Sequence, residues 1–213
     1  MRAERRRESL RPRVPRAVEA QTCFHALAAG VAWDTVPHAT LLTPRLELVP
    51  ITLDLAEAVM LGQRARAEEL VGAQLPEAWP GRALIERAFS ASLDHLRARP
   101  AERLWGDRVM IARAGARRVL GSVVFHGAPG EDGLVEVAYG VEQDSQQLGY
   151  ATEGTGACVA WALAQPDVRA VRATTPSWHA SSRRVLEKCG FTPIGSRESE
   201  SMLGELLEFE RRG

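Results

Sequence analysis

The sequence has very little lysine, and it has no net charge. Lys188 is the only lysine, so the 27 cationic residues are otherwise arginines, and 27 Asp and Glu residues balance them. Proteins that bind nucleic acid over a broad surface carry a basic face that neutralises phosphates. The balanced charge therefore argues against nucleic acid as the main partner.

Cysteines and long apolar runs are also scarce. Cys23, Cys158 and Cys189 are widely spaced, with neither a CxxC pair nor the spacing of metal ligands. We therefore expect free buried thiols in a reducing compartment and no metal site. No apolar run approaches the ~20 residues of a membrane span, and the segment CFHALAAGVAW is a poor signal peptide because it is mostly alanine and contains His25. The sequence predicts a cytoplasmic protein that does not bind membranes.

Residues 1–40 differ in composition from the rest of the chain. The opening MRAERRRESLRPRVPR has seven Arg, two Glu and two Pro, and few side chains that could form a core. Such a segment is typically disordered or loosely packed. A basic arm that contacts nucleic acid is the alternative interpretation. We therefore divide the chain into an Arg-rich extension, residues 1–40, and one domain, residues 41–213.

Regular periodicity begins near Thr43. The alternation in RLELV (45–49) predicts a first strand with Leu46 and Leu48 on one face. Helical spacing predicts helices over 53–71 and 81–99. The segments DRVMIARA and VLGSVVFHG on either side of GARR predict a hairpin. The remaining elements are expected as strands over 134–141, 168–175, 193–196 and 203–210, and as helices after the loop 142–149 and over 177–190. This order predicts an α/β (α+β) fold, with a mixed, mostly antiparallel sheet and helices on both faces.

The stretch QQLGYATEGTGACVAWALAQ (146–165) holds a candidate anion site. The loop 142–149 lies between a strand and a helix, where free N–H groups and the helix dipole favour an anion. Gly149 adopts backbone angles that other residues avoid and lets a ligand come close. Small residues between Gly154 and Ala164 let the helix pack tightly on a sheet. An ordinary packed connection has a similar sequence, so this pattern alone is not decisive.

Four segments, in the expected order, resemble the GCN5-related N-acetyltransferase (GNAT) superfamily. QQLGYA resembles its Arg/Gln-x-x-Gly-x-Gly/Ala signature, and TTPSWHASSRRVLEKCGF resembles its later Thr-x-x-x-Asn-x-x-Ser-x-x-Val-Leu-Glu-Lys-x-Gly-Phe motif. LTPRLELVPIT and VEVAYGV resemble two strands of the branch that contains ribosomal-protein alanine N-acetyltransferases. The resemblance covers residues 41–213 and implies one acetyl-CoA-dependent N-acetyltransferase domain, with its sheet splayed at the cofactor strand.

The resemblance also implies how acetyl-CoA binds. Its pantetheine arm would pair with the strand Tyr139–Val141, and His179, which replaces the motif's Asn, would lie near the pantetheine or the acetyl group. Gln147 replaces the first glycine that is common in the loop, and Leu148 replaces a basic residue. Backbone N–H groups survive both changes, but a favourable charge is lost. The N–H groups expected to hold the pyrophosphate are those of Gln146, Gln147, Leu148, Gly149, Tyr150, Ala151 and Thr152.

Acetyl transfer to an amine needs a base, a donor to the thioester oxygen and a proton for the leaving thiolate. Glu136 is the candidate base, directly or through a water, although a solvent-facing glutamate on an alternating strand has the same pattern. A backbone N–H near Val141 would polarise the thioester. Many relatives protonate the thiolate with a tyrosine at the position of Leu186. Ser182 is the remaining candidate donor, or else a small helix residue facing the sheet, and His179 is either an acid–base group or structural.

The acceptor is expected to be a primary amine, on a protein N-terminus or a small molecule. Its pocket is expected between the early helices and the final strands. A non-catalytic domain that binds or senses acyl-CoA is the alternative, favoured by Gln147, Leu148 and His179. A homodimer is left open. The candidate lining residues of the acceptor pocket are Trp79, Trp105, Glu198 and Glu200.

Overall fold

The computed structural model describes residues 39–77, 93–199 and 204–213. The chain divides into two units, Met1–Trp33 and Asp34–Gly213, and every described residue belongs to the second unit. The extension expected over 1–40 therefore lies almost wholly outside the described residues. Within the described part of the chain, no helix is long and apolar enough to cross a membrane.

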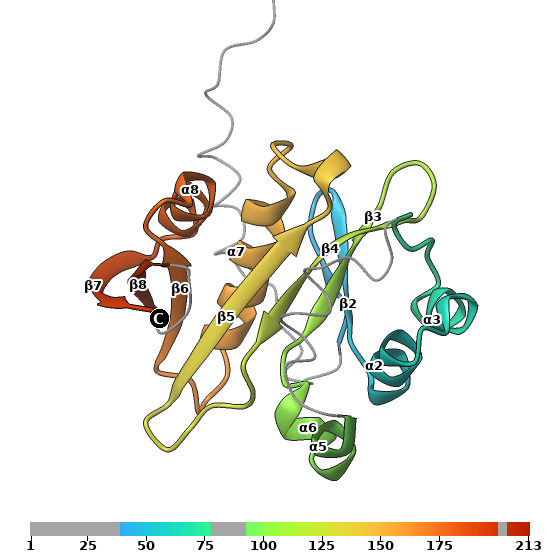
Figure 1. The fold of residues 1–213 in the computed structure, drawn as a ribbon, viewed down its shortest axis with the longest axis horizontal. Coiled ribbons are helices and arrows are strands. Elements are labelled where there is room, and N and C mark those ends of the chain that lie inside the picture. Colours follow the sequence, from blue (N-terminus) through green and yellow to red (C-terminus); the bar gives the residue numbers. More distant parts are fainter. Residues whose placement is uncertain (1–38, 78–92, 200–203) are drawn as a thin grey trace, which may run out of the picture. The chain divides into compact units, whose positions relative to one another are not determined.

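Eight strands form one sheet in the order β1-β2-β3-β4-β5-β6-β8-β7 (Figure 1). Neighbouring strands are antiparallel except β5 and β6, which are parallel. This confirms the expected mixed, mostly antiparallel sheet. The strands are β1 (Leu41–Leu42), β2 (Leu46–Pro50), β3 (Arg108–Ala112), β4 (Val119–Phe125), β5 (Leu134–Val141), β6 (Ala170–Pro176), β7 (Thr192–Glu198) and β8 (Glu205–Arg212).

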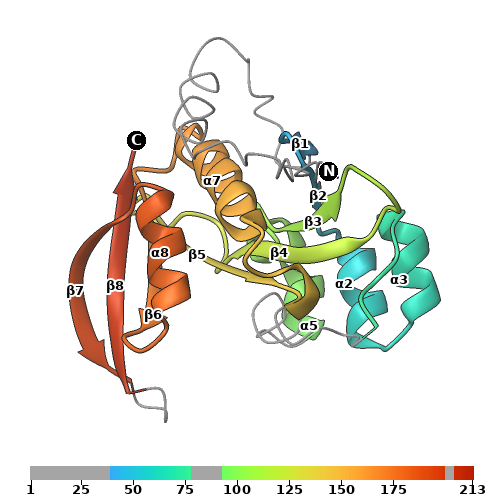
Figure 2. The same cartoon turned by 90° about the horizontal axis from the view of Figure 1, so that it is seen from above.

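Helices lie on both faces of the sheet, as expected, and Figure 2 shows α7 and α8 away from α2 and α3. The alternation of side chains along the strands separates the two faces. On β3, Val109 and Ile111 pack in the core cluster with α2 and α3, whereas Met110 lies against Gly154 of α7. The helices are α2 (Leu53–Met60), α3 (Arg64–Val71), α5 (Leu93–Ala98), α6 (Pro100–Arg103), α7 (Tyr150–Leu163) and α8 (Ala180–Lys188).

The helix expected over 53–71 is divided into α2 and α3. Gly62 follows the end of α2 with φ of 69°, a left-handed conformation that ends a helix and that glycine adopts without strain. The helix expected over 81–99 is also different at its carboxyl end, where α5 ends at Ala98 and Pro100 begins the short α6. Residues 81–92 of that expected helix lie outside the described residues.

The sheet opens between β5 and β6. Their parallel pairing covers Leu134–Glu136 on β5 and Ala170–Arg172 on β6, and the strands then separate. Gly121 on β4 helps β5 to follow this course, because a Cβ there would overlap with the carbonyl oxygen of Gly140. The carboxyl-terminal half of β5 thus remains paired with β4 and has a free edge toward β6.

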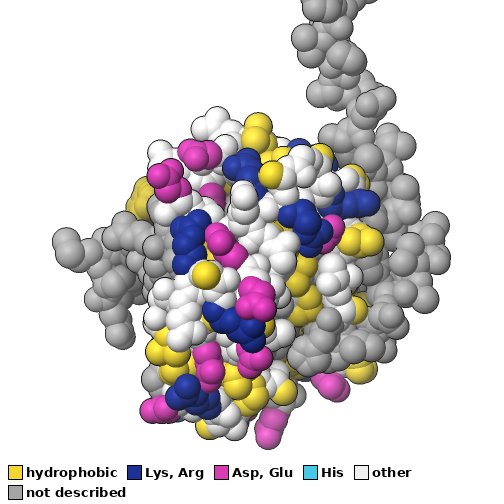
Figure 3. Space-filling model, turned by 90° about the vertical axis from the view of Figure 1, so that its right-hand side faces the viewer, with side chains coloured by type: hydrophobic (Ala, Val, Ile, Leu, Met, Phe, Trp, Pro, Cys, Tyr) yellow, Lys and Arg dark blue, Asp and Glu magenta, His cyan; other side chains and the backbone are white. Residues whose placement is uncertain are grey.

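Charges of both signs are interspersed on the face that carries α2 and α3 (Figure 3). Several are neighbours on one helix, such as Arg64 with Glu68, whose side chains lie 3.2 Å apart. Arg97 on α5 pairs with Glu57 on α2 at 2.6 Å. This face therefore has the mixed charge that the neutral composition predicts.

Candidate functional site

The free edge of β5 presents backbone groups to the gap between β5 and β6. His126 N–H donates to the Glu136 carbonyl at 2.9 Å, and Glu142 N–H donates to the Leu120 carbonyl at 2.8 Å, so the even-numbered residues of β5 bond to β4. Consecutive residues of a strand direct their backbone groups to opposite sides. The N–H and C=O groups of Val137, Tyr139 and Val141 therefore face the gap.

The loop after β5 leads into the amino terminus of α7. Within it, Gln147 has φ of 61° and Gly149 has φ of 83°. The first backbone hydrogen bond that closes a turn of α7 runs from Glu153 N–H to the Gly149 carbonyl at 3.1 Å. The N–H groups before Glu153 thus precede the helical ladder, and the N-cap Gly149 has no side chain to accept from them. This helix terminus has the donors of an anion site.

A large open pocket joins this loop to the free edge of β5 and to α8. Its volume is about 970 Å³, within the ~300–1,000 Å³ typical of small-molecule sites. Among the residues proposed from the sequence, Leu148 and Glu136 do not line it; the Leu148 side chain is exposed. The proposed residues that line it are Tyr139, Val141, Gln146, Gln147, Gly149, Tyr150, Ala151, Thr152, His179 and Ser182.

Tyr139 and Ser182 meet inside this pocket. The two hydroxyl oxygens are 3.0 Å apart, and the Tyr139 hydroxyl is also 3.0 Å from the Ser182 carbonyl oxygen, to which it can donate. For Tyr139, the sequence predicted only a backbone contact to the cofactor, and the contact of its side chain with α8 was not predicted. The position of Tyr139 three residues after Glu136 was the available signal, because it places the two side chains on opposite faces of β5.

The α8 wall of the pocket carries two cations that the sequence analysis did not single out. Arg184 and Lys188 both line the pocket and are exposed to solvent. They lie four residues apart, so they occupy the same side of the helix. Their spacing was readable from the sequence, but their place opposite the loop depends on the tertiary fold. They supply positive charge to a pocket whose loop lacks the common basic residue.

Glu136 lies on the other face of the sheet. It stands at the last paired position of β5 before the gap, and its Oε2 is 3.4 Å from Nδ1 of His126. The hydrogen bond from His126 is the largest influence that lowers the pKa of Glu136, and burial acts in the opposite direction. Smaller contributions from Thr174 and Arg197 also lower this pKa. Glu136 is therefore an ionised carboxylate near neutral pH, and the contribution of His126 was missed from the sequence.

A second, smaller pocket of about 320 Å³ surrounds Glu136. Its polar lining includes Arg172, Arg197 and Glu208, and Arg197 pairs with Glu208 at 3.1 Å. Other residues were expected to line the acceptor pocket. Glu198 does not line this pocket.

Trp105, which was also expected to line the acceptor pocket, lies in an aromatic cluster. Its ring packs against Phe125 and Trp161, with centroids 5.2 and 5.0 Å apart. Trp161 is fully buried on α7, whereas Trp105 is half-buried beside it and does not line the second pocket. Trp79 and Glu200, the other two residues named for the acceptor, lie outside the described residues.

The two cysteines within the described part of the chain, Cys158 and Cys189, are free and buried. Burial raises the pKa of each thiol to about 12. Both thiols are therefore neutral near neutral pH, as expected of thiols that serve packing.

Known proteins share this architecture. Residues 45–192 match the family model described as an acetyltransferase (GNAT) domain. The uncharacterized N-acetyltransferase YjdG of Bacillus subtilis (strain 168) is 27% identical over 85 residues, which are 40% of this chain and 51% of that protein. The chain thus spans about half the length of that curated relative.

Solved structures agree on the fold. A putative GNAT-family acetyltransferase from Bordetella pertussis superposes with a TM-score of 0.55 at 19% identity, covering 81% of this chain and 99% of that one. RimL, a ribosomal L7/L12 alpha-N-protein acetyltransferase solved in complex with coenzyme A, superposes with a TM-score of 0.53 at 14% identity, covering 81% and 97%. At such identities these likenesses concern the fold alone. Because the family model matches more than half of the chain, the chain belongs to the GNAT acetyltransferase family.

Proposed function

We propose that this protein transfers the acetyl group of acetyl-CoA directly to a primary amine, in a ternary complex of both substrates. The observation that carries the proposal is the large pocket, because one wall combines the amino terminus of α7 with the part of β5 that does not pair with β6. Those two features match the pyrophosphate and the pantetheine arm of a CoA molecule. Acetyl-CoA supplies the acetyl group as a thioester.

The loop before α7 is proposed to hold the pyrophosphate. The Gln146 N–H, which was expected to take part, is already donated to the Gln143 carbonyl at 3.2 Å. Backbone N–H groups from Gln147 to Thr152 donate to the phosphate oxygens, and the helix dipole adds about half a positive charge at this end. Arg184 and Lys188 on the opposite wall are proposed to contact the phosphate groups as exposed cations. Together they replace the charge that Leu148 does not provide.

The free edge of β5 is proposed to bind the pantetheine arm. The backbone groups of Val137, Tyr139 and Val141 face the gap, and an extended arm with amide groups completes the sheet there as an added strand would. The side chain of Gln146 already donates to the Val141 carbonyl at 3.1 Å. Because that carbonyl is already bonded, the N–H is the backbone group of Val141 that we assign as the donor to the thioester oxygen.

The acceptor amine is proposed to approach from the face that carries Glu136. The second pocket opens there, at the point where β5 and β6 separate. An amine seated in it would reach the thioester through the gap, so the two substrates would meet from opposite faces of the sheet. Such positioning supplies much of the rate enhancement in transfers between two bound reactants.

Glu136 and Ser182 are proposed to carry out the proton transfers. Glu136 accepts a proton from the incoming ammonium, directly or through a water, which frees the nitrogen lone pair for attack on the thioester carbon. The C–N bond forms as the C–S bond breaks, and the hydroxyl of Ser182 gives its proton to the thiolate while it receives the second proton that the nitrogen loses, so the products are the neutral amide, the free thiol and an unchanged serine. Tyr139 holds that hydroxyl in place through the 3.0 Å contact between the two side chains.

A panel of amines tests the proposal. Free thiol released from acetyl-CoA is measured with small amines and with peptides that begin with Ala or Ser, and Glu136→Gln is the matched control in each assay. We expect thiol release that depends on the amine and that falls by about a hundredfold in the variant. If the protein binds CoA but no amine gives release, the catalytic proposal fails and a non-catalytic acyl-CoA-binding domain takes its place. If it does not bind CoA, both fail.

A further inference from the structure

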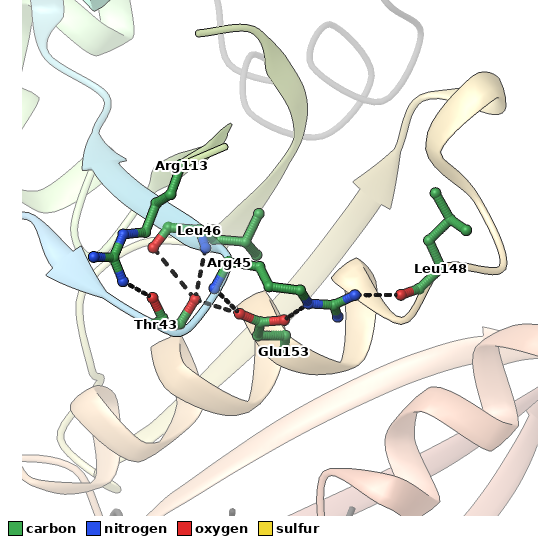
Figure 4. A network of polar contacts seen from close by, with 6 residues as sticks. All are labelled: Thr43, Arg45, Leu46, Arg113, Leu148 and Glu153. Carbon is green, nitrogen blue, oxygen red and sulfur yellow. Dashed lines mark hydrogen bonds and ion pairs between the residues drawn. The ribbon is translucent and has the colours of Figure 1, made fainter. Parts of the chain in front are cut away.

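Arg45, immediately before β2, reaches across to the loop that precedes α7 (Figure 4). Its Nε donates to Oε2 of Glu153 at 2.6 Å, and its Nη1 donates to the Leu148 carbonyl at 2.8 Å. The contacts join residues more than 100 positions apart in the chain. One guanidinium thus ties the loop to the first turn of the helix.

The carboxylate that anchors Arg45 is itself held firmly. Oε1 of Glu153 accepts from the Thr43 hydroxyl at 2.6 Å and from the Arg45 backbone N–H at 2.8 Å. The Glu153 side chain is 15% exposed, so water competes little for it. The guanidinium also lies over the Tyr150 ring, 4.6 Å from the centroid, where a cation–π contact is favourable. Arg45 is therefore fixed in orientation.

The bond to Leu148 sets the direction of the next N–H group. In a trans peptide the C=O and N–H bonds point in opposite directions. Because Arg45 holds the Leu148 carbonyl, the N–H of Gly149 faces away from Arg45. Gly149 also leaves space for the guanidinium, since a Cβ at this position would lie 3.2 Å from Nη2 of Arg45, which is closer than an ordinary contact.

We propose that Arg45 is a positioning residue that keeps the loop before α7 in its anion-binding conformation. The inference rests on the proposed function, and it assigns to Arg45 a geometric role, because Glu153 neutralises its charge. Gln147 holds a left-handed φ of 61° that an L side chain rarely adopts, so the loop needs support. Arg45 provides that support through its bond to the Leu148 carbonyl.

The test compares ligands with and without the pyrophosphate. In Arg45→Gln, we expect the Kd for CoA to rise on the order of tenfold, as loss of a charge-assisted contact network suggests. The kcat/KM for acetyl-CoA falls with it, whereas kcat/KM for S-acetylpantetheine, which lacks the pyrophosphate, is unchanged. Arg45→Lys gives an intermediate loss, because one ammonium lacks the fork that holds Glu153 and Leu148 together.

Arg117→Gln is the matched control. Arg117 also bridges a carboxylate and a carbonyl, with bonds to Glu47 at 2.7 Å and to the Gly72 carbonyl at 3.1 Å, and its side chain is 48% exposed against 47% for Arg45. It does not line the large pocket. We expect this variant to bind CoA as the wild type does.

Two results overturn the inference while leaving the proposed function intact: unchanged CoA affinity in Arg45→Gln, or an equal loss with both thioesters, which would indicate a general effect on folding. If Arg45→Gln does not fold, the same comparison of acetyl-CoA with S-acetylpantetheine is made with Arg45→Lys. A wild-type protein that binds no CoA overturns the proposed function, and the inference falls with it.

Discussion

The side chains of Tyr139 on β5 and Ser182 on α8 meet with their hydroxyl oxygens 3.0 Å apart. Both residues line the large pocket, and 43 positions separate them in the sequence. A serine hydroxyl alone has no preferred orientation, but a fixed neighbour restricts it. The pair is therefore the donor that we propose for a leaving thiolate.

If Tyr139 acts through Ser182, their variants are not additive. Tyr139→Phe and Ser182→Ala are each expected to lower kcat for thiol release on the order of tenfold, and the double variant to lower it by the same factor. Residues that work as one unit give such a result in a double-mutant cycle. A hundredfold loss in the double variant would show that the two hydroxyls act separately.

The pKa of Glu136 predicts the shape of the pH profile. This pKa is lowered from its ordinary value near 4.5, mainly by the bond from His126, so Glu136 stays ionised above about pH 5. We expect no acid limb from Glu136 in kcat/KM between about pH 5 and 8. In His126→Ala the largest lowering influence is lost while burial still raises the pKa, so an acid limb should move to higher pH.

The control for that profile is Glu136→Gln, which removes the carboxylate and with it any limb that belongs to it. An acid limb that persists in Glu136→Gln belongs to another group, such as the acceptor. A profile of His126→Ala identical to that of the wild type would mean that His126 does not influence the base.

Gln147→Gly is expected to stabilise the protein. The left-handed φ of 61° costs an L residue about 1 kcal/mol, and glycine adopts it freely, so the free energy of unfolding should rise by about 0.5–1 kcal/mol. The backbone N–H is retained, so CoA affinity should not fall. Gln146, with φ of −72°, gains nothing from glycine, and Gln146→Gly should lower stability instead. Denaturant unfolding of both variants measures the difference, and equal signs would argue against the loop conformation described.

The cations of α8 predict a salt-dependent affinity. The double variant Arg184→Gln and Lys188→Gln should bind CoA several-fold more weakly at low ionic strength, and the difference should shrink as salt screens exposed charges. Arg169→Gln removes an exposed cation outside the pocket and serves as the control. Calorimetric titration at two salt concentrations makes the comparison, and equal affinities for the double variant and the control would remove these cations from the phosphate site.

Local signals predicted the elements of the site well. The strand over 134–141 has the observed bounds of β5, and the helix after Gly149 begins at Tyr150. Such features depend on alternation and on a glycine between a strand and a helix, which can be read within a few residues. The break at Gly62 was equally local, but the continuous apolar spacing on either side of it favoured one helix.

The partners of the site were not predictable in the same way. The contacts of Glu136 with His126, of Tyr139 with Ser182, and of Arg45 with Glu153 join different elements, and they depend on how the sheet places those elements side by side. Periodicity says which face a side chain occupies but not what packs against that face. Trp105 illustrates this, because its contact with Trp161 of α7, with ring centroids 5.0 Å apart, could not be read from the sequence.

A crystal structure of the protein with acetyl-CoA is the most direct measurement of the central claim. We expect pyrophosphate oxygens within about 3 Å of the backbone nitrogens from Gln147 to Thr152, and the pantetheine arm along the free edge of β5. Coenzyme bound elsewhere, or a loop whose nitrogens point away from the phosphates, would contradict it.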